Sequence, residues 1–167
     1  MESITQYLEE NNISGWLVVA QFWIALLPRL YFSLFGPGSQ KGPEGKPIWD
    51  PKSPRDYPSR VFRARIQLGH KLAERIIRSE AAFNNALENL PLFAIAVLAA
   101  NLGSEEIWQI NIWTIRYIYV RVAYTYVYIY GQENPRFPGE VRTVVWLASI
   151  AILGYMFLLP FREGPFA

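Results

Sequence analysis

Four long apolar segments constrain the fold of this chain more than any other feature. The first, residues 15–35, has 21 residues and one charge, Arg29, and the others cover residues 81–102, 107–130 and 143–161. At about 1.5 Å per residue, about 20 helical residues cross the roughly 30 Å hydrocarbon core of a bilayer. The sequence therefore predicts an all-α protein that forms an integral membrane four-helix bundle.

A charged helical stretch from about residue 59 leads into the second apolar segment. We therefore predict a single domain over residues 1–167, with spans at about residues 15–35, 66–102, 107–130 and 141–161. The first two spans are joined by residues 36–60, which are rich in Pro and Gly and predict a loop, ordered by contact or flexible, not a separate domain.

The charges predict how the chain lies in the membrane. Basic residues gather in the loop after the first span and in the loop after the third, whereas acidic residues gather at the opposite end of the spans. By the positive-inside rule, both long loops lie in the cytosol and both termini on the other side. The expected location is the endoplasmic reticulum membrane in a eukaryote, or the inner membrane in a bacterium.

Composition excludes several kinds of chemistry. The chain has no cysteine and one histidine, so we expect neither a thiolate nucleophile nor a metal site. Membrane topology explains the basic loops, so we expect no nucleic-acid partner. The N-terminus lacks the basic start of a cleaved signal peptide, which predicts that the first apolar segment is retained as a span.

A polar stripe runs into the second span. Lys71, Arg78, Asn85 and Leu92 recur at intervals of seven residues and lie almost on one line of a helix, with Glu88 and Asn89 beside it. On the third span, Arg121, Tyr124 and Tyr128 share one face. Ionisable residues inside a span usually face the interior of a bundle, and they are often functional.

The polar residues of the second and third spans are expected to lie at the same depth in the membrane. Glu88 lies 14 residues before Leu102 and Arg121 lies 14 residues after Ile107, so each is about 21 Å from the same membrane face. Arg29 reaches a similar level in the first span. We therefore expect Glu88 and Arg121 to meet. Either they lock the bundle, with Asn85 and Asn89 as interhelical hydrogen bonds, or the stripe lines a polar pocket for a small zwitterionic ligand that has carboxylates and an ammonium group.

Three motifs resemble those of the MAPEG family, the membrane-associated proteins of eicosanoid and glutathione metabolism. The second span contains R-x6-N-x2-E-N-x-P-x-F from Arg78 to Phe93. The third contains R-V-A-Y-x3-Y from Arg121 to Tyr128, and the fourth opens with R-T-x2-W from Arg142 to Trp146. The motifs occur in this order, and the four-span layout covers the rest of the chain.

The resemblance implies a homotrimer with glutathione bound between adjacent subunits at the cytosolic side. It implies a catalytic role for Arg142, which would stabilise the glutathione thiolate, although Arg136 in the preceding loop is a rival for this role. Arg29 resembles a basic residue that some members carry in the first span. The full set of expected glutathione-binding residues is Arg78, Asn85, Glu88, Arg121, Tyr124, Tyr128 and Arg29.

The function implied by the resemblance is that of a glutathione-dependent membrane transferase or peroxidase. Its second substrate would be a lipophilic electrophile that enters from the membrane lipids. Ala81 and Phe83 stand where several characterised members have Arg and His or Gln. This difference leaves an alternative open, a non-catalytic relative that binds a lipid or scaffolds a membrane complex.

Overall fold

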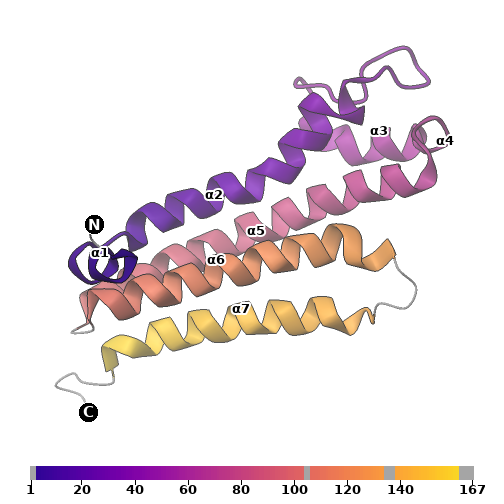
Figure 1. Ribbon diagram of the computed structural model, residues 1–167. Helices are drawn as coiled ribbons and strands as arrows, with labels where there is room; N and C mark the ends of the chain where they lie inside the picture. Colours follow the sequence, from indigo (N-terminus) through magenta and orange to yellow (C-terminus); the bar gives the residue numbers. More distant parts are fainter. Residues whose placement is uncertain (1–2, 104–105, 134–137, 162–167) are drawn as a thin grey trace.

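The computed structural model describes residues 3–103, 106–133 and 138–161, and within these ranges every regular element is helical. Four long helices run alternately in opposite directions, so that α1 and the end of α7 lie at the same end of the molecule (Figure 1). Their bounds are α2 Ser14–Leu30, α5 His70–Leu102, α6 Ile107–Tyr130 and α7 Glu140–Leu158. The predicted all-α architecture is confirmed for the described residues.

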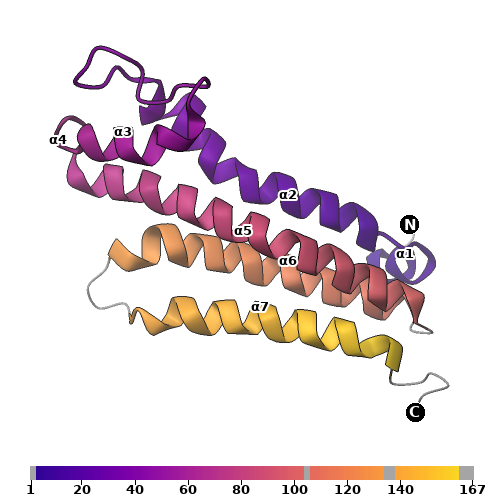
Figure 2. The same cartoon turned by 180° about the vertical axis from the view of Figure 1, so that it is seen from behind.

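The helices α5 and α6 form the central pair of the bundle. Helix α2 packs against both of them, and α7 packs against both of them from another side. In both views of the molecule, α2 and α7 lie at opposite edges (Figure 2). As a result, α5 has one face toward α2 and another toward α7.

Three helical segments of the described chain are long and apolar enough to cross a membrane. They are Ser14–Ser39, His70–Leu102 and Glu140–Phe161. Helix α6 has the predicted bounds and 24 residues. It is not among the three, because two arginines and several polar side chains lower its hydropathy. Its crossing of the membrane therefore stays a prediction.

The helix ends differ from the prediction where the backbone has a special conformation. The second long helix begins at His70 and not near residue 66, because Gly69 has a φ of 82° and ends the preceding turn. A residue with a side chain rarely adopts this left-handed conformation. The charged stretch before it forms two short helices, α3 (Tyr57–Arg63) and α4 (Arg65–Leu68). The N-terminal helix α1 (Ile4–Glu10) was not predicted.

The first span ends in a π-helical turn, η1 (Tyr31–Phe35), and is followed by a loop folded against the bundle. At Gly38 a Cβ atom would lie 2.6 Å from the carbonyl oxygen of Ser33, so the chain can pass there only as glycine. Ile48 is buried, and the Tyr57 hydroxyl donates a hydrogen bond to the carbonyl oxygen of Phe32 (3.0 Å). The loop is thus ordered by contact. Its two 3-10 turns are η2 (Pro37–Ser39) and η3 (Pro54–Asp56).

Two large apolar clusters form most of the core, one toward each end of the bundle, and a smaller third cluster contains Ala25, Phe83 and Ala86. The first contains Phe32, Tyr57 and Ile76, and the second contains Phe93, Tyr117 and Met156. Alanines on the buried face of α5 let its neighbours approach closely, as is typical of helices packed in membranes. They are Ala73, Ala82, Ala86, Ala96 and Ala100. Between the clusters, α5 and α6 present polar side chains to each other.

Candidate functional site

A cavity of about 460 Å³ opens between α5, α6 and α7, near the end of the bundle where α5 and α7 begin and α6 ends. This volume is in the range of small-molecule sites, about 300–1,000 Å³. The wall combines a carboxylate, amides, phenols and a guanidinium. The lining residues are Ala81, Asn84, Asn85, Glu88, Tyr124, Tyr128, Arg142, Thr143 and Trp146.

Two arginines and two tyrosines form a continuous row beside this cavity, which we call the aromatic row. The guanidinium carbon of Arg121 lies 4.8 Å from the ring centroid of Tyr124, whose ring lies 5.6 Å from that of Tyr128. The guanidinium carbon of Arg142 lies 5.0 Å from the Tyr128 ring. Cation–π contacts at such distances are attractive and fix the direction of the guanidinium group. The aromatic row therefore holds Arg142 of α7 against α6.

The predicted meeting of Glu88 and Arg121 is wrong. Arg121 is only 1% exposed, and its Nη2 donates a hydrogen bond to Oδ1 of Asn85 (2.9 Å). Glu88 is exposed and lines the cavity, without a hydrogen bond or ion pair to any described residue. The depths match, but Asn85, three residues before Glu88 on the same cavity wall, is the partner of Arg121.

The amides of the polar stripe have different roles. The hydrogen bond between Asn85 and Arg121 joins α5 to α6, as the interhelical alternative predicted. The Asn89 side chain instead donates to the backbone carbonyl of Asn85 (2.7 Å) within α5, so the prediction of an interhelical bond there is wrong. Of these two amides, Asn85 links α5 to α6, whereas Asn89 bonds within α5.

A comparison with the profiles of known protein families shows which family the chain belongs to. Residues 13–162 match the profile of the MAPEG family. The chain belongs to the MAPEG family. No significant match exists among curated proteins or among solved structures.

Membership identifies this MAPEG chain as an integral membrane protein of the family of glutathione and eicosanoid metabolism. It agrees with the three apolar helices that can cross a membrane. Five of the predicted site residues meet at the cavity: Asn85, Glu88, Tyr124, Tyr128 and Arg142. Arg121 lies behind Asn85 and outside the lining. Arg136, the rival of Arg142, lies outside the described residues.

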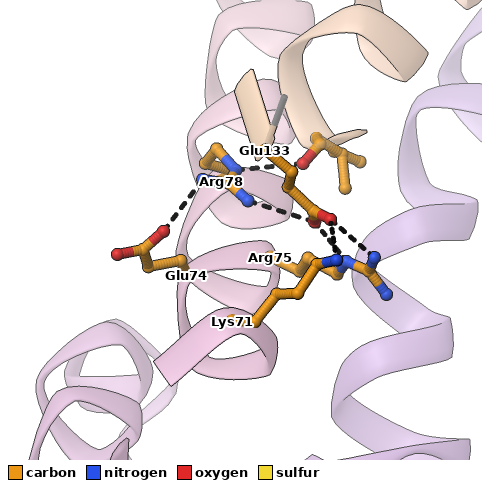
Figure 3. A network of polar contacts seen from close by, with 6 residues as sticks. Lys71, Glu74, Arg75, Arg78 and Glu133 are labelled. Carbon is orange, nitrogen blue, oxygen red and sulfur yellow. Dashed lines mark hydrogen bonds and ion pairs between the residues drawn. The ribbon is translucent and has the colours of Figure 1, made fainter. Parts of the chain in front are cut away.

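In this MAPEG chain Arg78 belongs to a separate polar network (Figure 3). Its Nε donates to the carbonyl oxygen of Ile129 (3.0 Å), while its Nη2 lies 3.3 Å from Glu133. Glu133 also pairs with Lys71 (3.2 Å) and binds Arg75 through both carboxylate oxygens. The hydrogen bond from Arg75, with a smaller contribution from Lys71, lowers the pKa of Glu133 to about 2. The network ties the end of α6 to the start of α5.

Arg29 does not reach the cavity either. Its Nε lies 2.9 Å from the Glu80 carboxylate on the face of α5 toward α2, and the Glu80 side chain is only 7% exposed. The guanidinium carbon also lies 4.8 Å from the Phe83 ring and 5.5 Å from the Trp49 ring. Phe83 thus packs against Arg29.

Sequence reasoning missed two polar residues with a clear role. Glu133 lies in the short turn η4 (Gly131–Glu133), where a single acid among basic residues gave no periodic signal. Asn111 is buried in α6, and its Nδ2 donates to the backbone carbonyls of Leu8 (2.9 Å) and Asn11 (2.8 Å). An asparagine inside an apolar segment was the one sequence signal that could have indicated such a contact.

Proposed function

We propose that this protein is a glutathione-dependent membrane transferase or peroxidase, and that the cavity between α5, α6 and α7 binds glutathione. The observation that supports it most is the arrangement of Glu88 and Arg142 on opposite helices of one cavity, neither of them held by an ion pair among the described residues. An unpaired carboxylate suits the ammonium group of glutathione. An unpaired guanidinium suits its sulfur.

The chemistry follows from the charge of Arg142. Glutathione supplies a nucleophilic sulfur, and a free thiol with a pKa of about 8.5 is mostly protonated at neutral pH. A guanidinium beside the sulfur favours the anion and lowers the thiol pKa by about 1–3 units. The cation–π contact with Tyr128 holds Arg142 in the cavity wall. Arg142 is therefore the catalytic residue of the proposal, and Asn85, Glu88 and Tyr124 hold the ligand.

The proposal includes the membrane arrangement. The end of the bundle with the cavity faces the cytosol, where glutathione is dissolved, and both termini lie on the other side. The basic loops at the cavity end support this orientation. The chain assembles as a homotrimer, so that a neighbouring subunit closes the open side of the cavity. The lipophilic second substrate enters from the lipid.

The test is the ultraviolet absorbance of the thiolate, measured when glutathione is added to the purified protein in detergent. Wild type should give the signal at neutral pH. Arg142→Ala should lose about ten-fold or more of it, because the thiol pKa rises, yet bind glutathione almost as well. Activity toward a lipophilic electrophile and toward a lipid hydroperoxide then distinguishes transferase from peroxidase.

Arg136→Ala is the matched control, because it removes the other basic residue near the start of α7. It should keep the thiolate signal. Loss of the signal in Arg136→Ala and its persistence in Arg142→Ala would transfer the catalytic role to Arg136. A wild type that binds glutathione without any thiolate would contradict the enzymatic proposal.

A second candidate is a lipid-binding protein without catalysis, and one observation favours it. An apolar cavity of about 340 Å³ lies between α2 and α6, near Pro28, and its wall is almost entirely aliphatic and aromatic. Such a wall suits an acyl chain. If the wild type gives no thiolate and a tightly bound lipid is recovered by mass spectrometry, this candidate replaces the first.

A further inference from the structure

A second polar cavity lies away from the first, between α3 and the loop that follows the first long helix. Its volume is about 250 Å³. This is less than the roughly 300–1,000 Å³ of sites for drug-sized molecules, and it suits a small polar group. The basic side chains on its wall are Lys46, Arg60 and Arg63, and the acidic ones are Glu44 and Asp56. In both views the loop lies at the edge of the molecule, beside the end of α2 (Figures 1 and 2).

The loop wall of this cavity is a short hairpin held by backbone hydrogen bonds. The N–H group of Gly42 donates to the carbonyl oxygen of Lys46 (2.8 Å), and that of Ile48 donates to the carbonyl oxygen of Gln40 (2.9 Å). Gly45 makes the tight turn possible with a φ of 72°. Ile48 is only 1% exposed and anchors the hairpin in the apolar core. The wall is therefore formed by the fold itself.

The cations on the wall keep hydrogen-bond donors that the protein does not use. Nη1 of Arg60 lies 3.1 Å from Oδ2 of Asp50, yet this buried atom has no hydrogen-bond acceptor at a favourable angle among the described residues. Arg63 pairs with Glu44 (3.0 Å), but both side chains are more than half exposed, so the pair contributes little stability. Lys46 is exposed and forms no ion pair with any described residue. All three cations can therefore donate to a ligand.

The charge of the segment favours an anion with several acceptor oxygens. Residues 41–65 contain seven basic and three acidic side chains. A phosphate monoester carries a charge of about −1.5 to −2 near neutral pH and has three strong acceptor oxygens. Guanidinium groups bind such a group through two N–H donors at once. The three cations of the cavity thus match a phosphate monoester in both charge and number of donors.

The cavity also lies at the depth of lipid headgroups. Phe32 is 18 residues after Ser14, so it lies about 27 Å along the first span. The Tyr57 hydroxyl binds the carbonyl oxygen of Phe32, and α3 runs from there beside the start of α5 toward α4 (Figure 1). Arg60 and Arg63 therefore lie about 5 and 9 Å further out. The headgroup layer extends about 5–8 Å beyond the hydrocarbon core on each side.

We propose that the cavity between α3 and the loop binds the phosphate monoester of a membrane lipid headgroup, with Lys46, Arg60 and Arg63 as its donors. This site is separate from the cavity between α5, α6 and α7 and does not depend on the proposed activity. In the proposed orientation it lies in the cytosolic leaflet, where anionic lipids gather. The bound headgroup would fasten the loop to the membrane surface.

The test is a calorimetric titration of the purified protein in detergent with three short-chain probes. They are dioctanoyl phosphatidylinositol monophosphate, dioctanoyl phosphatidylinositol, which lacks the monoester, and the deacylated headgroup glycerophosphoinositol monophosphate. Wild type should bind the first probe at least about ten-fold more tightly than either of the others. Equal binding of the two lipids would show that the monoester is not recognised and would overturn the proposal. Equal binding of the deacylated headgroup would assign the site to a soluble phosphate compound and would overturn the lipid source.

Two double variants with the same charge separate a site from general attraction. Lys46→Gln with Arg63→Gln removes two donors of the cavity and should weaken the monophosphate lipid about 100-fold or more, the loss of two charge-assisted hydrogen bonds. Lys52→Gln with Arg55→Gln, in the same segment but outside the cavity wall, should weaken it less than about five-fold. All four side chains are exposed, so both variants should unfold at the wild-type temperature. Equal weakening by the two variants would overturn the proposal.

Arg60→Lys tests the role of the guanidinium group in particular. It keeps the positive charge beside Asp50 but loses the planar arrangement of donors. The monophosphate lipid should bind about ten-fold more weakly, while the unfolding temperature stays close to that of wild type. Binding as tight as that of wild type would contradict the assignment of Arg60 as a donor to the phosphate.

Discussion

The two faces of α5 use the same kinds of residue in opposite ways. On the face toward α2, Glu80 is buried and pairs with Arg29 at 2.9 Å, under the rings of Phe83 and Trp49. On the face toward α6 and α7, Glu88 is exposed in a cavity and has no ion pair among the described residues. The two carboxylates are eight residues apart, about 12 Å along the helix.

The comparison shows that the neighbouring helix determines whether a charged side chain within a span is paired. Where α2 supplies a guanidinium, the carboxylate is satisfied and stabilises the fold. Where α6 supplies a guanidinium that binds Asn85 instead, the Glu88 carboxylate has no ion pair among the described residues, and in the proposed function it binds the ligand. Groups held in position without an internal partner are typical of functional sites.

The largest expected effect is on stability, from a change on the face of α5 toward α2. Arg29→Met leaves Glu80 as a buried charge without its partner, and should lower the free energy of unfolding by about 3–5 kcal/mol. The measurement is unfolding in detergent with increasing sodium dodecyl sulfate, followed by circular dichroism. Glutathione binding should survive in the fraction that stays folded, because Arg29 does not line the cavity.

The double variant Arg29→Met with Glu80→Leu is the control, because it removes both charges. It should recover most of the lost stability. If Arg29→Met alone unfolds like wild type, the pair does not stabilise the bundle, and the contrast between the two faces is wrong.

A smaller effect is expected from a change on the face of α5 toward α6 and α7. Glu88→Gln should change the free energy of unfolding by less than about 0.5 kcal/mol, because Glu88 is exposed and unpaired. It should weaken glutathione binding about 10- to 100-fold, because a charge-assisted hydrogen bond to the ammonium group is lost. Chemical unfolding and calorimetry on the same preparation check both. A large loss of stability would restore the pairing of Glu88 with Arg121.

The smallest effect concerns the network of Glu133 at the end of α6. Glu133→Gln should lower the melting temperature by a few degrees near neutral pH. Its pKa falls from 4.5 to about 2 through the contacts with Arg75 and Lys71, so its stabilisation is complete above pH 4.5 and is lost as the pH falls toward 2. The difference in melting temperature between wild type and variant should be constant from pH 6 to 8 and should disappear in acid. A gap that changes between pH 6 and 8 would exclude this explanation.

Much of the fold could be predicted because it depends on local composition. The length of the apolar segments predicted the four long helices, and the match was closest for α6, whose predicted bounds agree with the structure. The start of α5 was missed because a single positive φ at Gly69 interrupts a stretch whose composition is helical throughout. Helix α1 is short and polar, and the buried Asn111 of a distant segment holds it in place.

The site was predictable in part for the same reason. Heptad spacing placed Asn85 and Glu88 on one face, and the family motifs added Tyr124, Tyr128 and Arg142. The partners of Arg29, Arg78 and Arg121 were not predictable, because depth in the membrane fixes only one coordinate of a side chain. The direction in which the side chain points depends on the rotation of α5 about its own axis, and this rotation depends on the packing of all the helices together.

The central claim is that the cavity between α5, α6 and α7 binds glutathione, and a calorimetric titration tests it most directly. Glutathione is titrated into wild type and into Ala81→Trp, which fills the cavity with a bulky side chain and removes no charge or hydrogen bond. Saturable binding to wild type, with loss of binding to an equally stable Ala81→Trp, is the predicted result. No binding to wild type, or equal binding to both proteins, would contradict the account.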